Sequence, residues 1–434
     1  MNIRKIVKSI IPKNLFRKIE PFGHLIEAVL ANIRYGFPAR KLRIIGVTGT
    51  NGKTTTSFFI HRMLHEAGVP VALMSTVANG MGAEIETQQE HATTARAFVL
   101  QRRMREYAKR GAKWIVVETS SHALAQHRVW GIPYEVAVMT NVTGDHLDYH
   151  GTFEHYRDAK RKLFKIANRN ENGLGVVNYD DKNANLFASD VKRAVTYGIQ
   201  GGELQASDLE LSSTHTKYIA TTNDETYNIT LNIPGEFNVS NSLAAIAVGR
   251  HVGLGKEQIE NGLAALRMVE GRMNTVDEGQ PFGVIVDFAS TPDGFEQFFS
   301  SVRPLTKGKL IAVFGSAGRR DEAKRAVQGG IAAKYADTLV ITEEDDRDVD
   351  GNEILEQIAE GARKKGAVDD TTLFKVLDRT EAIRKAFDLA TSEDDTVVLL
   401  GKGHERTIER ADGEHDWNET EVARTLLRER ATQG

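Results

Sequence analysis

The fold is decided by one stretch, Ile44-Ile45-Gly46-Val47-Thr48-Gly49-Thr50-Asn51-Gly52-Lys53-Thr54-Thr55-Thr56. A short apolar run predicts a buried strand that leads into a glycine-containing turn, and a helix is expected to begin at Lys53 or Thr54. Successive backbone N–H groups in such a turn bind polyphosphate oxygens. Gly49 and Gly52 permit close backbone approach. Lys53 would neutralise the β- and γ-phosphates, and Thr54 or Thr55 would offer a hydroxyl to Mg²⁺.

The rest of the chain alternates short β-branched runs with longer amphipathic segments, which is typical of parallel α/β units. Strands are predicted at 42–47, 114–118, 135–140 and 175–178, with a second series at 283–287, 309–314, 338–342 and 396–400. Helices are predicted at 54–67, 98–110 and 239–252. Residues 203–232 are rich in Thr and Ser with alternating apolar positions, which predicts antiparallel strands on the edge of the first sheet.

These patterns predict an α/β protein with a central P-loop ATPase domain of mostly parallel sheet and a C-terminal Rossmann-like α/β domain. We place the basic amphipathic N-terminal segment at 1–43, the ATP-binding domain at 44–270 and the C-terminal domain at 271–434. The active site is expected between the two domains.

Composition and charge exclude several kinds of site and partner. The 434 residues include no cysteine, which excludes disulfides and thiolate metal sites. No apolar run approaches the length of a membrane span and no signal peptide is visible, so a cytoplasmic globular protein is expected. Residues 1–43 carry ten bases and two acids, a net charge of +8, whereas the remainder carries 46 bases and 57 acids, a net charge of −11. An acidic body argues against nucleic acid as a partner.

Three further groups of polar residues could carry chemistry. Glu118 follows an apolar strand, and a carboxylate at that position could bind Mg²⁺ beside the loop or simply face water. The stretch 141–151 contains two carboxylates and two imidazoles within six residues, which could bind a metal or hold a loop together. Lys160 lies fourteen residues after His146, in a basic run that on its own is typical of a solvated helix face.

Gly49–Thr56 resembles the ATP loop of the Mur ligases, ATP-dependent amide-forming enzymes of peptidoglycan precursor synthesis. It departs from the general pattern GxxxxGK[ST], since Val47 stands where the first glycine is usual. Asp145–Gly151 is similar to the DHLDYHG motif of the tripeptide-synthetase branch, which adds the third residue of the stem peptide. Gly271–Met273 resembles the family's GRM turn, and Gly401–Glu405 resembles its GKGHE motif. The resemblance runs in order from about residue 42 to about residue 425.

The resemblance implies a role for each matching residue. ATP would contact Gly49, Thr50, Asn51, Gly52, Lys53, Thr54, Thr55, Asn141, Asn241 and Asp287, with Asn238 capping the helix that carries Asn241. Two Mg²⁺ ions would be held by Thr54, Glu118, His146 and Lys160. The catalytic residues would be Lys53, Lys160, His146 and Arg272. The acceptor would contact Thr93, Thr94, Ser120 and Arg128, and the incoming amino acid would contact Asp345, Arg347, Gly401 and Glu405.

Lys160 falls on the lysine that reacts with CO₂ in Mur ligases and becomes a carbamate. A carbamate turns a cationic amine into an anionic metal bridge. Its formation needs a neutral amine, and therefore a desolvated lysine with a lowered pKa.

Two motifs depart from the family pattern. Phe288 and Ser290 replace the Tyr and His of DYAHTPD, which removes a phenol and an imidazole. Asp345 and Asp346 replace the Asn and Pro of DNPR, where Arg347 is kept. The stretch 342–348 nevertheless contains five acids and one arginine, which favours a diamino acid as substrate. Arg347 could grip the distal carboxylate of meso-diaminopimelate, so this amino acid is preferred over lysine.

Typical Mur ligases begin with a uridine-binding domain, and here about 43 residues precede the loop strand. We therefore expect that domain to be missing and the acceptor to be held mainly through its peptide carboxylate. The leader interleaves apolar residues (Ile3, Ile6, Val7, Ile10, Ile11, Leu15 and Phe16) with lysines and arginines. It could bind an anionic membrane surface or a partner protein, although packing on its own body is the simpler expectation.

The predicted activity is ATP-dependent ligation of a free amino acid to a muramoyl-peptide carboxylate through an acyl phosphate, by a monomer with two Mg²⁺ ions and a carbamylated Lys160. One alternative is a related ligase on another acceptor, of the cyanophycin or folylpolyglutamate type. Another is a nucleotide-binding module that has lost catalysis.

Overall fold

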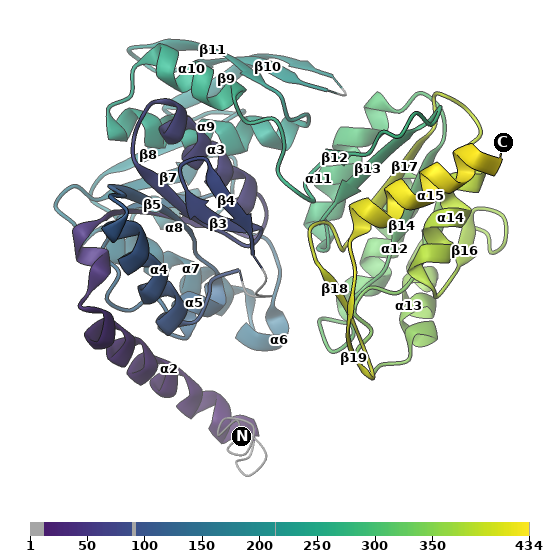
Figure 1. Cartoon of the computed structure of the whole chain (residues 1–434), viewed down its shortest axis with the longest axis horizontal. Coiled ribbons are helices and arrows are strands. Elements are labelled where there is room, and N and C mark those ends of the chain that lie inside the picture. Colours follow the sequence, from purple (N-terminus) through teal and green to yellow (C-terminus); the bar gives the residue numbers. More distant parts are fainter. Residues whose placement is uncertain (1–12, 89–92, 213, 434) are drawn as a thin grey trace.

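The strand that leads into the glycine turn, β1 (Arg43–Thr48), lies inside the largest of three β-sheets. Figure 1 labels several of its other strands, among them β5, β7 and β8. The computed structural model describes residues 13–88, 93–212 and 214–433. The other strands of this sheet are β2 (Val71–Met74), β3 (Ala78–Met81), β4 (Glu84–Thr87), β5 (Trp114–Glu118), β6 (Tyr134–Met139), β7 (Leu174–Asn178), β8 (Ala194–Gly198), β9 (Leu204–Leu211), β10 (Thr216–Thr221) and β11 (Thr226–Leu231). Their order is β11-β10-β9-β8-β7-β6-β1-β5-β2-β3-β4.

The centre of this sheet is parallel and both of its edges are antiparallel. β1 pairs in parallel with β5 and β6, so the carboxyl ends of these strands meet at one edge, where α/β sheets bind ligands. The predicted antiparallel strands of 203–232 are confirmed as β9, β10 and β11. The meander β2-β3-β4 on the other side was not predicted.

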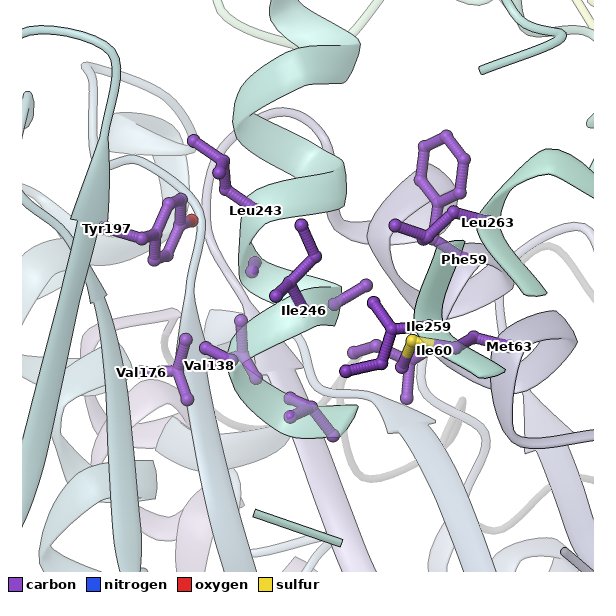
Figure 2. Close-up of a cluster of buried hydrophobic side chains, with 14 of the residues drawn as sticks. Phe59, Ile60, Met63, Val138, Val176, Tyr197, Leu243, Ile246, Ile259 and Leu263 are labelled. Carbon is purple, nitrogen blue, oxygen red and sulfur yellow. The ribbon is translucent and has the colours of Figure 1, made fainter. Parts of the chain in front are cut away.

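Helices cover both faces of the first sheet. Alternate residues of β1 point to opposite faces: Ile45 and Val47 join one core, and Ile44 joins the other. Side chains of α3, α9 and α10 fill the first core (Figure 2), and those of α4, α5, α7 and α8 fill the second. The helices are α3 (Lys53–Glu66), α4 (Ala97–Lys109), α5 (Ser121–Ala125), α6 (Leu147–His150), α7 (Phe153–Ala167), α8 (Ala184–Ala188), α9 (Glu236–Val252) and α10 (Lys256–Ala264).

The second lobe is a smaller α/β unit. Its strands are β12 (Asn274–Thr275), β13 (Gly283–Asp287), β14 (Leu310–Phe314), β15 (Thr338–Ile341), β16 (Leu373–Lys375) and β17 (Thr396–Leu400), in the order β12-β13-β17-β14-β15-β16. A separate hairpin consists of β18 (Thr407–Arg410) and β19 (Gly413–Asp416). The helices are α11 (Pro292–Val302), η2 (Arg303–Leu305), α12 (Ala323–Tyr335), α13 (Gly351–Arg363), α14 (Arg379–Leu389) and α15 (Glu419–Gln433). The predicted α/β fold class is therefore confirmed.

The chain before β1 forms α2 (Lys13–Tyr35) and the short helix η1 (Pro38–Lys41). Ala28 and Ala31 of α2 pack against Ala97 of α4, so this part of the leader does rest on the body. Residues 1–12, which include five of the predicted apolar positions, lie outside the described residues. Within the described ranges, no helix is long and apolar enough to cross a membrane.

Candidate functional site

Gly49 and Gly52 of the loop lie so close to other residues that a larger side chain would collide with them. A Cβ on Gly49 would lie 1.8 Å from Thr140 Oγ1, and one on Gly52 would lie 2.3 Å from Asn241 Oδ1. Gly52 also has a φ of 79° and stands at the N-cap of α3 without a side-chain cap. Backbone N–H groups at the start of α3 are thus left to bind an anion, as the sequence predicts.

The carboxyl end of β6 holds the loop in place. Asn51 N donates to Asn141 Oδ1 at 2.9 Å, and Thr140 Oγ1 donates to Asn51 O at 2.6 Å. Thr50 Oγ1 lies 3.0 Å from the Tyr156 hydroxyl of α7. The loop is therefore pre-organised by groups that follow β6 and by one on α7, all far from the loop in the sequence.

Three cations converge on the loop. Lys53 Nζ donates to Thr50 O at 2.7 Å, and Lys160 Nζ donates to Gly49 O at 2.5 Å. Arg272 Nη2 reaches Thr54 Oγ1 at 3.5 Å, while its Nε has no hydrogen-bond partner among the described residues. None of the three forms an ion pair within 4.0 Å in the described part of the chain.

Burial lowers the pKa of Lys53 and Arg272. It lowers the pKa of Lys160 well below the ordinary lysine value, and the nearby Lys53 charge adds to this effect. Lys160 is 2% exposed, so the expectation of a solvated basic face is wrong for this residue. Desolvated cations without ion-pair partners, here Lys53 and Arg272, are suited to a polyanion.

Glu118 supplies the negative charge beside these cations. The carboxylate is 1% exposed, accepts hydrogen bonds from Thr54 Oγ1 at 3.0 and 3.1 Å, and accepts one from Thr76 N at 2.9 Å. The alternative of a water-facing glutamate is therefore wrong. A buried carboxylate next to a loop threonine is the donor pair that Mg²⁺ takes at a phosphate site.

A histidine cluster lies near Lys160, whose charge acts on His146. The ring centroids of His122 and His146 are 4.6 Å apart, and those of His122 and His150 are 5.4 Å apart. Burial lowers the pKa of His122 and His146 to about 3, and neighbouring cations add to the effect. His146 adopts a left-handed conformation with a φ of 54°. Neutral imidazoles can ligate a cation, yet among the described residues no three His, Asp or Glu side chains form a complete metal site.

A cavity of about 780 Å³ opens beside the loop, between the two lobes. Asn51, Asn141 and Asn241 line it from the first lobe, and Arg272 and Asp287 line it from the second. The resemblance implies nucleotide contacts for Asn51, Asn141, Asn241 and Asp287 and a catalytic role for Arg272, and the fold brings all five together. Asn238 does not cap α9, because the N-cap is Gly235 and the Asn238 amide instead donates to Pro234 O from inside the helix.

The second lobe closes on the loop through direct contacts. Asn51 Nδ2 donates to Asp293 Oδ2 at 2.6 Å, and Thr291 Oγ1 donates to Asn51 Oδ1 at 3.3 Å. At Gly271 the connection between the lobes passes close to the backbone of His404. A Cβ there would lie 2.2 Å from His404 N. Asp287 anchors this turn by accepting from Met273 N at 2.8 Å.

The predicted acceptor residues lie next to Glu118. Thr94 Oγ1 donates to Glu118 O at 2.9 Å and accepts from Ser120 N at 2.9 Å. Arg128 Nη1 donates to Thr94 O at 3.2 Å. Thr93 lies beside Thr94 and lines a narrow pocket with Glu118. These residues therefore lie beside Glu118 and not in the lining of the cavity between the lobes.

The predicted amino-acid loop lies in the second lobe, and Asp345, Arg347 and Glu405 are already in ion pairs. Lys402 Nζ lies 2.8 Å from Asp345 Oδ1 and 2.6 Å from Glu405 Oε2. Arg347 Nε donates to Glu409 Oε2 at 2.7 Å, and its Nη1 donates to Gly318 O at 2.5 Å. A Cβ on Gly401 would meet the Glu344 carboxylate. The guanidinium of Arg347 therefore faces internal partners in this structure.

Sequence reasoning gave no role to Thr140, Tyr156 or Asp293, which all contact the loop. Tyr156 precedes Lys160 by four residues on α7, and Lys160 Nζ lies 4.4 Å from the centroid of its ring. Helical spacing could have placed the pair on one face. Asp293 and Thr140 gave no such signal, because their contacts depend on how the lobes and strands meet.

Comparison with known proteins identifies the family of this chain. The Mur ligase middle domain matches residues 47–249, and the Mur ligase glutamate ligase domain matches residues 271–403. The UDP-N-acetylmuramyl-tripeptide synthetase of Roseiflexus sp. (strain RS-1) is 39% identical over 423 residues, which cover 94% of this chain and 83% of the relative. The chain belongs to the Mur ligase family. Mur ligases are ATP-dependent acid–amino-acid ligases, and this chain is one of them.

Other relatives carry more specific names. The UDP-N-acetylmuramoyl-L-alanyl-D-glutamate–2,6-diaminopimelate ligase of Syntrophomonas wolfei is 40% identical over 412 residues, covering 92% of this Mur ligase and 81% of the relative. A solved structure of a ligase with the same name is 30% identical, covers 90% of this chain and 79% of its own, and has a TM-score of 0.62. MurF from Thermotoga maritima in complex with ADP, at 18% identity and a TM-score of 0.68 over 93% of this chain and 84% of its own, shares the fold.

Proposed function

We propose that this Mur ligase adds a diamino acid of the diaminopimelate type to UDP-N-acetylmuramoyl-L-alanyl-D-glutamate, in peptidoglycan precursor synthesis. The observation that carries the proposal is the pair of cations Lys53 and Arg272 at a glycine loop, without ion-pair partners among the described residues. Such a set suits a triphosphate whose γ-phosphoryl group is transferred. The names of the relatives suggest the acceptor and the amino acid.

In the proposed reaction, the acceptor carboxylate attacks the γ-phosphorus of ATP, giving an acyl phosphate and ADP. The amine of the incoming amino acid then attacks the acyl carbon, so that an amide forms and phosphate leaves. Lys53 and the N–H groups before α3 would bind the β- and γ-phosphates, and Arg272 would approach them from the second lobe. The cavity lined by Asn141, Asn241 and Asp287 is large enough for the nucleoside.

Mg²⁺ fits the donors at this site. Thr54 and Glu118 would hold one ion, and His146 with a carbamate on Lys160 would hold another. When bound, Mg²⁺ would neutralise phosphate charge next to the acceptor carboxylate. Two observations support the carbamate: Lys160 is buried, and its lowered pKa favours the neutral amine that reacts with CO₂.

The acceptor would lie along Thr93, Thr94, Ser120 and Arg128, which brings its carboxylate to Glu118 and the loop. The amino acid would bind beside Asp345, Arg347, Gly401 and Glu405. Glu344 and Asp346 add two acids that are largely buried, and burial next to Glu343 and Glu344 raises the pKa of Asp346 to about 6. This acidic surface favours a cationic side chain.

The test is a ligation assay with the purified full chain, ATP, Mg²⁺ and the UDP-linked dipeptide acceptor, in which released phosphate and product mass are both measured. Diaminopimelate, lysine, alanine and glutamate are supplied in separate reactions. We expect one phosphate for each amide, a requirement for Mg²⁺, and product with the diamino acids only. Product with glutamate alone, or ATP hydrolysis without any amide, would refute the proposal.

A further inference from the structure

Helix α2 presents a row of exposed, large apolar side chains. Phe22 is 68% exposed, Ile26 61%, Leu30 53% and Ile33 61%. Spacings of four, four and three residues place them on one face of the helix. Isolated exposed apolar residues are ordinary, whereas a continuous row marks a surface that binds something.

The opposite face of α2 is the one that packs on the body. Ala28 and Ala31 are buried against α4, and Asn32 Nδ2 donates to Trp130 O at 2.9 Å. Glu27 lies 3.0 Å from Arg96 of the first lobe. The apolar row therefore points away from the protein, and Figure 1 shows α2 extending beyond the first lobe.

The segment of sequence that contains the row is strongly basic. Residues 1–43 have a net charge of +8, against −11 for the rest of the chain. The acids Glu20 and Glu27 both lie beside His24 on the body side of the helix. Arg34, at the carboxyl end of α2, is exposed. An anionic partner would be attracted to this end of the molecule and repelled by the remainder.

A hollow with a basic lining lies near the body side of α2. It measures about 590 Å³. Trp130, one of its lining residues, accepts a hydrogen bond from Asn32 of α2 through its backbone oxygen. Trp130, 40% exposed, stands in its lining. The charged residues that line it are all basic: Arg40, Lys162, Lys165 and Arg169. Basic residues with an exposed tryptophan are typical of proteins that contact the lipid headgroup region.

We propose that α2 is a docking surface for an anionic lipid bilayer, on which the helix lies flat with its apolar row in the headgroup region. Helix α2 is not apolar enough to span the membrane, so it would lie on it. A second copy of the chain is a poor occupant, because two segments of charge +8 would repel each other. The area of four side chains is also far smaller than the surface of about 800 Å² that each partner buries in a stable protein interface.

The experiment measures flotation of the purified full chain with vesicles of phosphatidylcholine alone, or of phosphatidylcholine containing about one third phosphatidylglycerol. We expect binding to the anionic vesicles, weakened by salt, and at least about tenfold less binding to the neutral ones. Ile26→Ser/Ile33→Ser should reduce binding to anionic vesicles by about tenfold or more, because burial of two large side chains is lost.

The matched control is Val327→Ser/Val368→Ser, which removes two apolar side chains that are 51% and 56% exposed in the second lobe. It should bind vesicles as the wild type does. Circular dichroism and ATP-dependent ligation should be unchanged in both variants, which separates this proposal from that for the catalytic site. Equal binding of wild type and Ile26→Ser/Ile33→Ser would overturn the proposal. So would absence of binding to anionic vesicles, or a wild-type dimer that the α2 variant dissociates.

Discussion

The phosphate loop and the amino-acid loop treat charge in opposite ways. Around the phosphate loop, Lys53 and Arg272 are desolvated and have no ion-pair partner among the described residues. In the amino-acid loop, Asp345 is paired with Lys402, and Arg347 is paired with Glu409. At the phosphate loop, a bound ligand would have to provide the negative charge. In the amino-acid loop, Asp345 and Arg347 are already neutralised by neighbouring side chains.

This difference predicts which substitutions should affect catalysis and which should affect stability. Desolvated cations without partners reduce stability, so their removal should harm catalysis while leaving the fold intact. Buried ion pairs are costly to break, because the remaining partner is left uncompensated. An amino-acid substrate must therefore compete with ion pairs that already exist in the amino-acid loop. Its selectivity depends on how well it replaces them.

The largest effect on stability is expected at Arg379 in the second lobe. Its guanidinium is 0% exposed and lies 2.6 Å from the buried Glu419 carboxylate. Arg379→Met should lower the free energy of unfolding by about 3–5 kcal/mol, since Glu419 would be left unpaired. Urea denaturation measures this. Arg384→Met removes an exposed pair with Glu429 and should cost less than about 1 kcal/mol; similar losses in the two variants would contradict the account.

Lys53→Ala should abolish ligation without loss of stability. We expect kcat to fall by about a thousandfold, because a cation at the transferred phosphoryl group is removed. Phosphate release measures activity, and thermal denaturation checks the fold. Lys109→Ala, an exposed lysine on α4, is the control. Turnover near the wild-type rate would show that Lys53 does not bind the phosphates.

Lys160→Ala should reduce kcat by about a hundredfold or more, since a metal bridge would be lost. A short carboxylate such as acetate should restore part of the activity by filling the vacated position. Lys160→Arg keeps the positive charge but cannot form a carbamate, so it should be inactive and resist rescue. An active Lys160→Arg enzyme would argue for a simple cation instead.

Arg347→Ala is expected to have the smallest effect. It should lower kcat/KM for diaminopimelate by about 1.5–3 kcal/mol and leave that for lysine nearly unchanged. Glu409→Gln removes the internal partner of Arg347 and should raise kcat/KM for diaminopimelate if the guanidinium is then available to the substrate. Unchanged selectivity in both variants would mean that Arg347 only holds the hairpin β18–β19.

Much of the fold could be predicted from local patterns. The strands at 114–118, 283–287 and 396–400 have the predicted bounds, because short β-branched runs in parallel sheets are buried on both faces. The meander β2-β3-β4 was missed, since its second and third strands are short and Glu84–Thr87 is mostly polar. Helix α9 begins three residues before the predicted position because Gly235, without a capping side chain, starts it.

The site was predicted unevenly for a similar reason. Loop residues such as Gly49 and Lys53 act through local spacing, which a sequence displays. The burial of Lys160 and the pairing of Arg347 with Glu409 depend on tertiary contacts between residues 62 to 111 positions apart. Local patterns carry no information on such contacts, so the basic run around Lys160 is typical of a surface helix when it is considered alone.

The central claim is that the phosphate loop is charged to receive a triphosphate. Calorimetric titration of ATP and AMP into the wild type and into Lys53→Ala/Arg272→Ala, with Mg²⁺ present, tests it most directly. The wild type should bind ATP at least about a hundredfold more tightly than AMP, and the variant should lose most of that difference. Equal affinities in the wild type, or a preference for ATP that survives both substitutions, would contradict the account.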